Sequence, residues 1–440
     1  MRHVAIRAVS LLVLVGVTRF ALLALGLAPD PEHLAKNWQT LALSDLEQNL
    51  AFEIWNLHSQ PPLWNSLVGA ASKLCSADIQ CVVWLGYLGN LVLTWVSACL
   101  ILEMLLHLKI ARRLAAFLTT VFVLSPSTIY YEFSIFYAHP SMALMVGLAF
   151  CLCRFTFRNE AKMLIYALIL AACLCWLWSL FHPMFIGVVF VCGVLINARI
   201  ALTTKSLVVA ALALGLALAP SIKNQIKFGL FMNGSWAGLN VSQVIRDVQP
   251  SFDPSCNFFD VLVRQEAIGI LHSGTALNNP GMIPLSKQCL KLSMSAAFQS
   301  PGPIISNRLS ALVERHSMMP HDYFLSPINW QVIPDLPFGR NGSFNNTKEG
   351  LSVKIFEWFT LGFYLFAFLS LVKLALTHED RATRRYFASL LIIALWFTAM
   401  SFAFNRAEQQ RMRYTIEPFF LITIGMIVSQ FAEMVRSRRP

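Results

Sequence analysis

The chain has 440 residues, of which 56% are hydrophobic and only 13% are charged, and its mean hydropathy is +0.59. Because a soluble domain carries about 25% charged residues, this composition excludes an ordinary soluble protein and indicates a membrane protein. A net charge of +11 would suit a protein that binds nucleic acid. We expect no nucleic-acid partner, since the basic residues lie between apolar runs rather than in one stripe.

Apolar runs of roughly the length that a membrane-spanning helix needs, about 20 residues, recur along the chain. The first begins like a signal peptide, but it continues to Ala28 without a clear cleavage site, so we interpret it as a retained span. The sequence therefore predicts an all-α polytopic membrane protein with about ten transmembrane helices. The ten runs cover approximately residues 4–28, 80–106, 114–131, 138–157, 164–180, 184–200, 206–222, 355–376, 386–404 and 414–435.

Lysine and arginine residues occupy alternate connections between these runs. Positive charge in short connections favours the cytoplasmic side, and the connections near 132–138 and 181–183 have no such residue. The pattern predicts that both termini are cytoplasmic, in the plasma (inner) membrane of a bacterium or the endoplasmic reticulum of a eukaryote. The basic positions are the N-terminus, 109–113, 154–162, 199–205, 381–385 and 436–439.

Two long segments, 29–79 and 223–354, then lie outside the membrane. The first contains a partly amphipathic, helix-like stretch that suits a helix lying along the membrane surface. The second is rich in Pro, Gly, Asn and Ser, and its length predicts a small mixed extracytoplasmic cap. We therefore divide the chain into a transmembrane module, 1–222, the cap, 223–354, and a second transmembrane module, 355–440.

Ten cysteines are present, and six of them lie in apolar runs, where a small core residue is the simplest interpretation. The other four lie in or beside the polar segments expected outside. One or two disulfide bonds among these four are consistent with that placement, but spacing alone does not fix the pairing. The four are Cys75, Cys81, Cys256 and Cys289.

Three carboxylates lie at the expected outer membrane surface. Asp30 directly follows the first span in "LAPDPEHL", with Glu32 two residues later. Asp30 could act as a general base or hold a divalent cation, although Asp before Pro-Glu is also a good helix cap. Glu132 lies in the aromatic stretch "YYEFSIFYAHP". Such rings exclude water, so an ionised Glu132 should need a partner.

Histidines and arginines complete the set of candidate site residues. We single out His139 in the same aromatic stretch, His58 in "WNLHSQPPLWN" and His182 in "SLFHPMF" as candidates for lining a site, although a lone histidine is more often structural. The connection "FNRAEQQRMRY" contains three arginines on the side where positive charge opposes insertion. Arginine binds phosphate through a planar fork of donors, whereas pairing with Glu408, Glu417 or phospholipid is the alternative. The three are Arg406, Arg411 and Arg413.

Four stretches, in their order and placement, resemble the GT-C glycosyltransferases, especially the branch with protein mannosyltransferases and lipid A aminoarabinose transferases. They are "APDPEH", "HSQPPLWN", the region around "YYEFSIFYAHP", and "RMRYTIEPFF".

This resemblance implies an enzyme that transfers a sugar, with inversion, from a polyprenyl- or dolichyl-phosphate donor to a glycan, lipid or protein acceptor outside the cytoplasm. By the same resemblance, Asp30 corresponds to the catalytic carboxylate and Glu132 to a second acidic residue. Arg411 and Arg413 would bind the donor phosphate, with Arg406 secondary. Many members have Asp-Glu or Asp-x-Asp where this chain has Asp-Pro-Glu, so a divalent metal at Asp30 stays open.

Two other classes of protein also stay open. A transporter or flippase for a lipid-linked or anionic solute would place charges and helix breaks at mid-membrane depth. These spans are nearly free of charge there, and Arg19, near the outer third of the first span, is the exception. An enzyme like the O-antigen ligases or polymerases would work through a late outer loop, which 223–354 suits better than the segment around Asp30 does.

Overall fold

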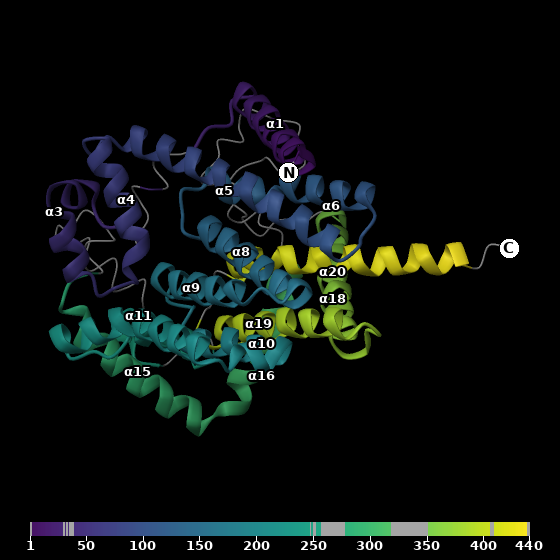
Figure 1. The fold of residues 1–440 in the computed structure, drawn as a ribbon. Coiled ribbons are helices and arrows are strands. Elements are labelled where there is room, and N and C mark those ends of the chain that lie inside the picture. The colour runs from purple at the N-terminus through teal and green to yellow at the C-terminus, as the bar shows by residue number, and fades with distance from the viewer. Residues whose placement is uncertain are drawn as a thin grey trace.

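The computed structural model describes residues 2–29, 31, 34, 39–246, 248–249, 252–256, 278–317, 351–404 and 409–437 (Figure 1). Over these ranges the chain forms helices and no β-strand. The helices are α1 (Arg2–Ala24), α3 (Leu43–Asn56), α4 (Pro62–Leu74), α5 (Ile79–His107), α6 (Arg112–Leu124), α7 (Pro126–Phe133), α8 (Ala138–Arg158), α9 (Ala161–Leu177), α10 (Met184–Ala201), α11 (Thr204–Phe228), α12 (Ala237–Arg246), the 3₁₀ helix η1 (Pro254–Cys256), α15 (Met282–Gln299), α16 (Pro301–Ser317), α18 (Leu351–Thr377), α19 (Arg381–Phe404) and α20 (Gln409–Ser437).

Among the described helices, α1, α5, α8, α10, α11 and α20 are long and apolar enough to cross a membrane. The helices α6 and α7 together make a seventh candidate, and α9 and the stretch Leu361–Thr377 of α18 are apolar but shorter. Each of the ten runs predicted from the sequence lies mostly on helix, although 4–28 and 164–180 extend past the ends of α1 and α9 and 114–131 covers two helices. The protein is therefore a helical, multi-pass membrane protein, and length and apolar character support six or seven of the ten predicted spans.

The predicted span 114–131 is broken into α6 and α7, which meet at an angle of 44°. The break follows from Ser125-Pro126. Proline disfavours helical backbone angles in the residue before it, and Ser125 accordingly has extended angles (φ −62°, ψ 138°). The Ser125 hydroxyl then caps α7 by accepting a hydrogen bond from the Thr128 N–H at 3.2 Å. The bend directs the short helix α7, with Glu132 near its end, into the centre of the bundle.

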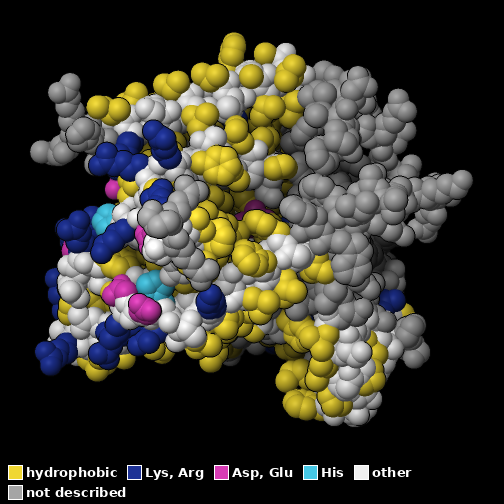
Figure 2. Space-filling view, turned by 90° about the vertical axis from the view of Figure 1, so that its right-hand side faces the viewer, with side chains coloured by type: hydrophobic (Ala, Val, Ile, Leu, Met, Phe, Trp, Pro, Cys, Tyr) yellow, Lys and Arg dark blue, Asp and Glu magenta, His cyan; other side chains and the backbone are white. Residues whose placement is uncertain are grey.

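One end of the helix bundle gathers the basic connections. Side-chain contacts join the start of α1 to the end of α5, the start of α19 to the ends of α5 and α10, and the end of α10 to the turn before α9. Figure 2 views this side of the molecule and shows Lys and Arg side chains gathered over one part of it, beside hydrophobic ones. The contacts are Arg7–Glu103 (2.9 Å), Tyr386–Met104 (3.4 Å), Arg385–Ile196 carbonyl (2.8 Å) and Asn197–Asn159 (3.1 Å).

The opposite end, on the left of Figure 1, holds α3 and α4 of the first long connecting segment, with α15 of the second segment at the lower left. In the first segment, α3 packs on α4 and exposes Phe52 and Trp55, which suits the predicted helix along the membrane surface. The disulfide Cys75–Cys81 closes the turn between α4 and α5. The described part of the second segment is helical, so the predicted mixed cap contains α12, η1, α15 and α16 and no described strand.

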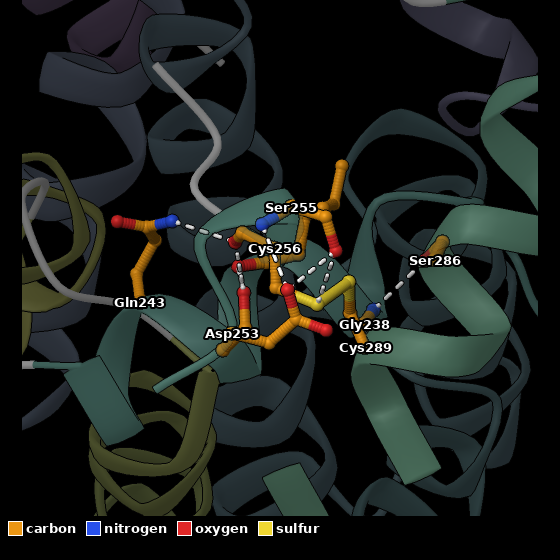
Figure 3. The surroundings of a disulfide bond; sticks show 9 residues. Gly238, Gln243, Asp253, Ser255, Cys256, Ser286 and Cys289 are labelled. Carbon is orange, nitrogen blue, oxygen red and sulfur yellow. Dashed lines mark hydrogen bonds between the residues drawn. A yellow bond between two sulfur atoms is a disulfide. The ribbon is translucent and has the colours of Figure 1, made fainter. Parts of the chain in front are cut away.

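A second disulfide, Cys256–Cys289, joins η1 to α15 (Figure 3). The carbonyl oxygen of Cys256 also accepts hydrogen bonds from Ser242 (2.7 Å) and Gln243 (3.2 Å) of α12. All four cysteines expected in polar segments are therefore paired, and the pairing that the sequence left open is 75–81 and 256–289.

Gly238 allows α12 to lie directly against α15. A Cβ atom at this position would lie 1.8 Å from the backbone oxygen of Ser286. We expect Gly238→Ala to force the helices apart and to destabilise the protein by about 1–3 kcal/mol, as overpacking does. Thermal unfolding in detergent measures the change, with Gly302→Ala as the control, because a Cβ there meets nothing within 4 Å. Equal unfolding temperatures for the two variants would contradict the predicted close packing.

Candidate functional site

The bent helix α7 delivers Glu132 to Arg19 of α1. The arginine forms a two-pronged ion pair, with its Nε 2.8 Å from Glu132 Oε1 and its Nη2 3.0 Å from Oε2. Arg19 Nη2 also donates to the carbonyl of Val123 at 2.8 Å. Arg19 is 1% exposed and Glu132 is 0% exposed. The expectation that Glu132 needs a partner is confirmed, and the exceptional arginine of the first span is that partner.

A chain of hydrogen bonds leads from Glu132 across the bundle to α20. Thr94 donates to Glu132 Oε2 at 2.7 Å, and His139 Nε2 lies 3.1 Å from both Thr94 Oγ1 and the Asn90 carbonyl. Because a carbonyl only accepts, Nε2 carries the proton of the neutral ring. His139 Nδ1 then accepts from the hydroxyl of Tyr414, 2.8 Å away. His139 is thus connected to a residue of α20 that lies 275 positions later in the chain.

A second ion pair lies one turn along α20. Arg413 Nε is 3.3 Å from Glu417 Oε1, and the hydroxyl of Tyr364 in α18 donates to the same oxygen at 2.6 Å. The guanidinium carbon of Arg413 lies 4.4 Å from the centre of the Tyr364 ring, a cation–π contact. Tyr131 of α7 stacks on Tyr414 with ring centres 4.4 Å apart. The two ion pairs therefore belong to one cluster of buried polar and aromatic residues.

We call this cluster the outer polar network. Its members are Arg19, Asn90, Thr94, Tyr131, Glu132, His139, Tyr364, Arg413, Tyr414 and Glu417. Arg19 and His139 lie near the ends of α1 and α8 that face away from the basic connections. Thr94 and Tyr364 lie midway along α5 and α18. In an apolar bundle each ionised group is stable only with a partner, and the network supplies one to each of its four charges.

His58 belongs to a different cluster, where the first outer segment meets the second. Its backbone N–H donates to Asn278 Oδ1 at 2.9 Å, its ring Nδ1 lies 2.9 Å from Ser235 Oγ, and its carbonyl accepts from Ser235 N–H at 2.8 Å. The ring edge packs on Phe228 with centres 4.9 Å apart. Burial, reinforced by the positive charge of Lys223, lowers the pKa of His58 to about 4. His58 therefore holds two outer segments together as a neutral side chain.

The remaining predicted site residues are placed only in part. His182 is exposed in the turn before α10, where its Nδ1 accepts from the Met184 N–H at 3.4 Å, and it makes no described contact with the network. Asp30, Glu32 and Arg406 lie outside the described residues. Arg411 is in the first turn of α20, and its side chain lies outside the described part.

Of the predicted residues, the structure brings together Glu132, His139 and Arg413. The pairing of Arg413 with Glu417 is the alternative that the sequence raised for these arginines, and their spacing of four residues places the two side chains on one face of α20. Thr94, Tyr364 and Tyr414 were not predicted. Their contacts join helices far apart in the chain, which no local pattern reveals.

No protein-family model matches the chain, and no curated protein matches it either. The site must therefore be interpreted from its own geometry.

The Arg19–Glu132 pair gives a test of how much the network contributes to stability. Glu132→Gln leaves the Arg19 charge buried without its counter-charge, so we expect a loss of about 3–5 kcal/mol in unfolding free energy. The double variant Arg19→Met, Glu132→Leu removes both charges and should lose less than Glu132→Gln. Thermal unfolding in detergent compares the variants. As a control, Glu103→Gln breaks the half-exposed Arg7–Glu103 pair and should cost at most about 1 kcal/mol. If Glu132→Gln and Glu103→Gln lose similar amounts of unfolding free energy, Glu132 is not an ion-paired carboxylate shielded from water.

The lowered pKa of His58 predicts a pH dependence of stability. The folded value of about 4 lies below the unfolded value of about 6.5. The neutral ring therefore contributes its full stability above pH 6.5, and that contribution is lost as the pH falls from 6.5 toward 4. We expect His58→Gln to flatten the fall in unfolding temperature between pH 7.5 and 5, where about 2 kcal/mol of stability is lost. His378→Gln, at the basic end, is the control. Identical pH profiles for wild type and His58→Gln would contradict the assignment.

Proposed function

We propose that the protein is a glycosyltransferase that takes a sugar from a polyprenyl- or dolichyl-phosphate donor and transfers it at the extracytoplasmic membrane surface. The observation that carries the proposal is the outer polar network. It places two carboxylates, two arginines and three tyrosines in a bundle of apolar helices, at the end where the first span leads into the segment that begins with Asp30. A lipid-linked sugar presents its polar headgroup at this depth, between lipid and water.

The orientation of the chain supports this placement. The basic connections share one end of the bundle, which favours the cytoplasm for that end. Both disulfides lie at or near the other end, and disulfides persist in oxidising compartments outside the cytosol. We therefore propose ten spans with both termini in the cytoplasm, and a GT-C-like fold in which α3 and α4 lie along the outer membrane surface.

The proposed reaction is a single displacement. The acceptor hydroxyl oxygen attacks the anomeric carbon while the bond from that carbon to the phosphate oxygen breaks, and its electron pair leaves with the phosphate. The hydroxyl proton passes to the carboxylate of Asp30, the general base. The leaving phosphate needs its charge stabilised, and Arg413, with Arg411 and Arg406 nearby in the chain, supplies the cationic groups.

The network gives Glu132 a positioning role in this scheme. Its two oxygens accept three hydrogen bonds from Arg19 and Thr94, which fix the bend of α7 and, through His139 and Tyr414, the start of α20. Arg413 lies one residue before Tyr414, so the same contacts set its position. A divalent metal ion remains an open part of the proposal, with Asp30 as its ligand. Among the described residues no group of three or more His, Cys, Asp or Glu could hold one.

One observation favours the transporter or flippase as the second candidate function. Arg19–Glu132 and Arg413–Glu417 are charged pairs on membrane helices, which are common along transport pathways. The enzyme is the stronger proposal because Arg19 and Arg413 lie near the ends of α1 and α20 that face away from the basic connections.

The catalytic role of Asp30 is tested by Asp30→Asn. The amide keeps the size and capping ability of the carboxylate but cannot take a proton, so we expect transfer to fall on the order of 100-fold or more with normal folding. The assay measures free polyprenyl phosphate released from a panel of polyprenyl phosphate hexoses and pentoses, by the protein in liposomes with a membrane extract as acceptor. Glu32→Gln, two residues away, should keep most of the activity. Full turnover by Asp30→Asn would leave the helix cap as its role, and no release by wild type would refute the proposed reaction.

A further inference from the structure

The two carboxylates of the outer polar network differ in what they can still bind. Both oxygens of Glu132 accept hydrogen bonds, and the residue is 0% exposed. Glu417 uses one oxygen only: Oε1 accepts from Tyr364 and Arg413. Its Oε2 has no hydrogen-bond donor among the residues that the structure describes, and its side chain is 17% exposed. Glu417 is thus the carboxylate of the network that a ligand can reach.

The position of Glu417 is fixed by its neighbours. Tyr364 holds Oε1 from α18 while its ring packs against the Arg413 guanidinium, and the ring of Phe420 meets Tyr364 edge-on with centres 5.8 Å apart. Two donors on packed side chains hold Oε1, which restricts the positions that Oε2 can take. An acceptor that is held in place before the ligand arrives loses little entropy on binding.

The environment of Glu417 selects the chemistry of its ligand. It lies in the first two turns of the apolar part of α20, where a carboxylate facing only acyl chains would be costly. Arg413 balances its charge, so the pair has no net attraction for a cation. What remains is a strong hydrogen-bond acceptor beside tyrosine rings. Hydroxyl groups satisfy such an acceptor, and a sugar offers several of them on one small ring.

We propose that Glu417 Oε2 accepts a hydrogen bond from a hydroxyl group of the lipid-linked sugar. The inference rests on the proposed function, and it names the residue that distinguishes the sugar-bearing donor from the bare lipid phosphate. A site built around a charged acceptor rejects a ligand without the matching hydroxyl, because the acceptor is then left unsatisfied. Glu417 would then hold the sugar part of the headgroup, apart from the groups proposed to hold its phosphate.

The test compares the affinities of two probes for the protein in nanodiscs: polyprenyl phosphate, and polyprenyl phosphate carrying mannose or glucose. We expect wild type to prefer a sugar-bearing probe by about tenfold, the size of one hydrogen bond to a charged group. Glu417→Gln should abolish that preference. Glu433→Gln is the matched control, because Glu433 is an exposed carboxylate on the same helix near its basic end. It should leave the preference unchanged.

Glu417→Asp covers the case in which Glu417→Gln does not fold because Arg413 has lost the counter-charge of Glu417. It keeps the charge but withdraws the carboxylate by one methylene group, so it too should lose the preference. A wild type that binds both probes equally, or a folded Glu417 variant that keeps the preference, overturns the inference. The proposed function is tested by a different result. If wild type prefers the sugar-bearing probe but releases no polyprenyl phosphate in the transfer assay, the protein binds the donor without transferring its sugar, and the proposed function is wrong while the inference about Glu417 stands.

Discussion

A charge can be kept inside an apolar helix bundle only with a partner, and much of this structure follows from that constraint. Moving one guanidinium or carboxylate out of water costs several kcal/mol even after relaxation. The attraction between Arg19 and Glu132 offsets that cost, but only if the two side chains lie within hydrogen-bond distance of each other. The first span must present Arg19 at one depth, and the break at Ser125-Pro126 must turn α7 inward so that Glu132 reaches it. The hydrogen bonds through Thr94 and His139 then place Tyr414, and with it the start of α20.

The same constraint explains which parts of the fold could be predicted from sequence. Apolar runs marked the positions of the long apolar helices, because burial in lipid or protein demands long apolar segments whatever the contacts are. The alternation of basic connections placed them together at one end. The aromatic surroundings of Glu132 indicated that it needs a partner. The identity of that partner was beyond a local pattern, since Arg19 is 113 positions away and several basic residues could have served.

The candidate site was predicted less completely, for a related reason. Sequence reasoning selects residues that are unusual for their surroundings, such as Glu132 and the arginines before the last span. It does not find residues such as Thr94, Tyr364 and Tyr414, which are ordinary in a membrane helix and become important only through the side chains they meet. The disulfides show the same limit: four cysteines could be selected by their polar surroundings, but only the packing of η1 on α15 joins Cys256 to Cys289.

The separation between Arg19 and Glu132 also has a consequence for how the protein is made. Ribosomes add about 5–20 residues per second, so the first span leaves the ribosome roughly 6–23 s before the residue that neutralises it. During that interval the guanidinium has no counter-charge in its own helix and must reach toward the water at the membrane surface. Tyr414 is synthesised later still, so the hydrogen bonds that complete the network form only when the chain is nearly finished. Assembly of the bundle is therefore a late, post-insertion event, in which early helices wait in the membrane for the last one.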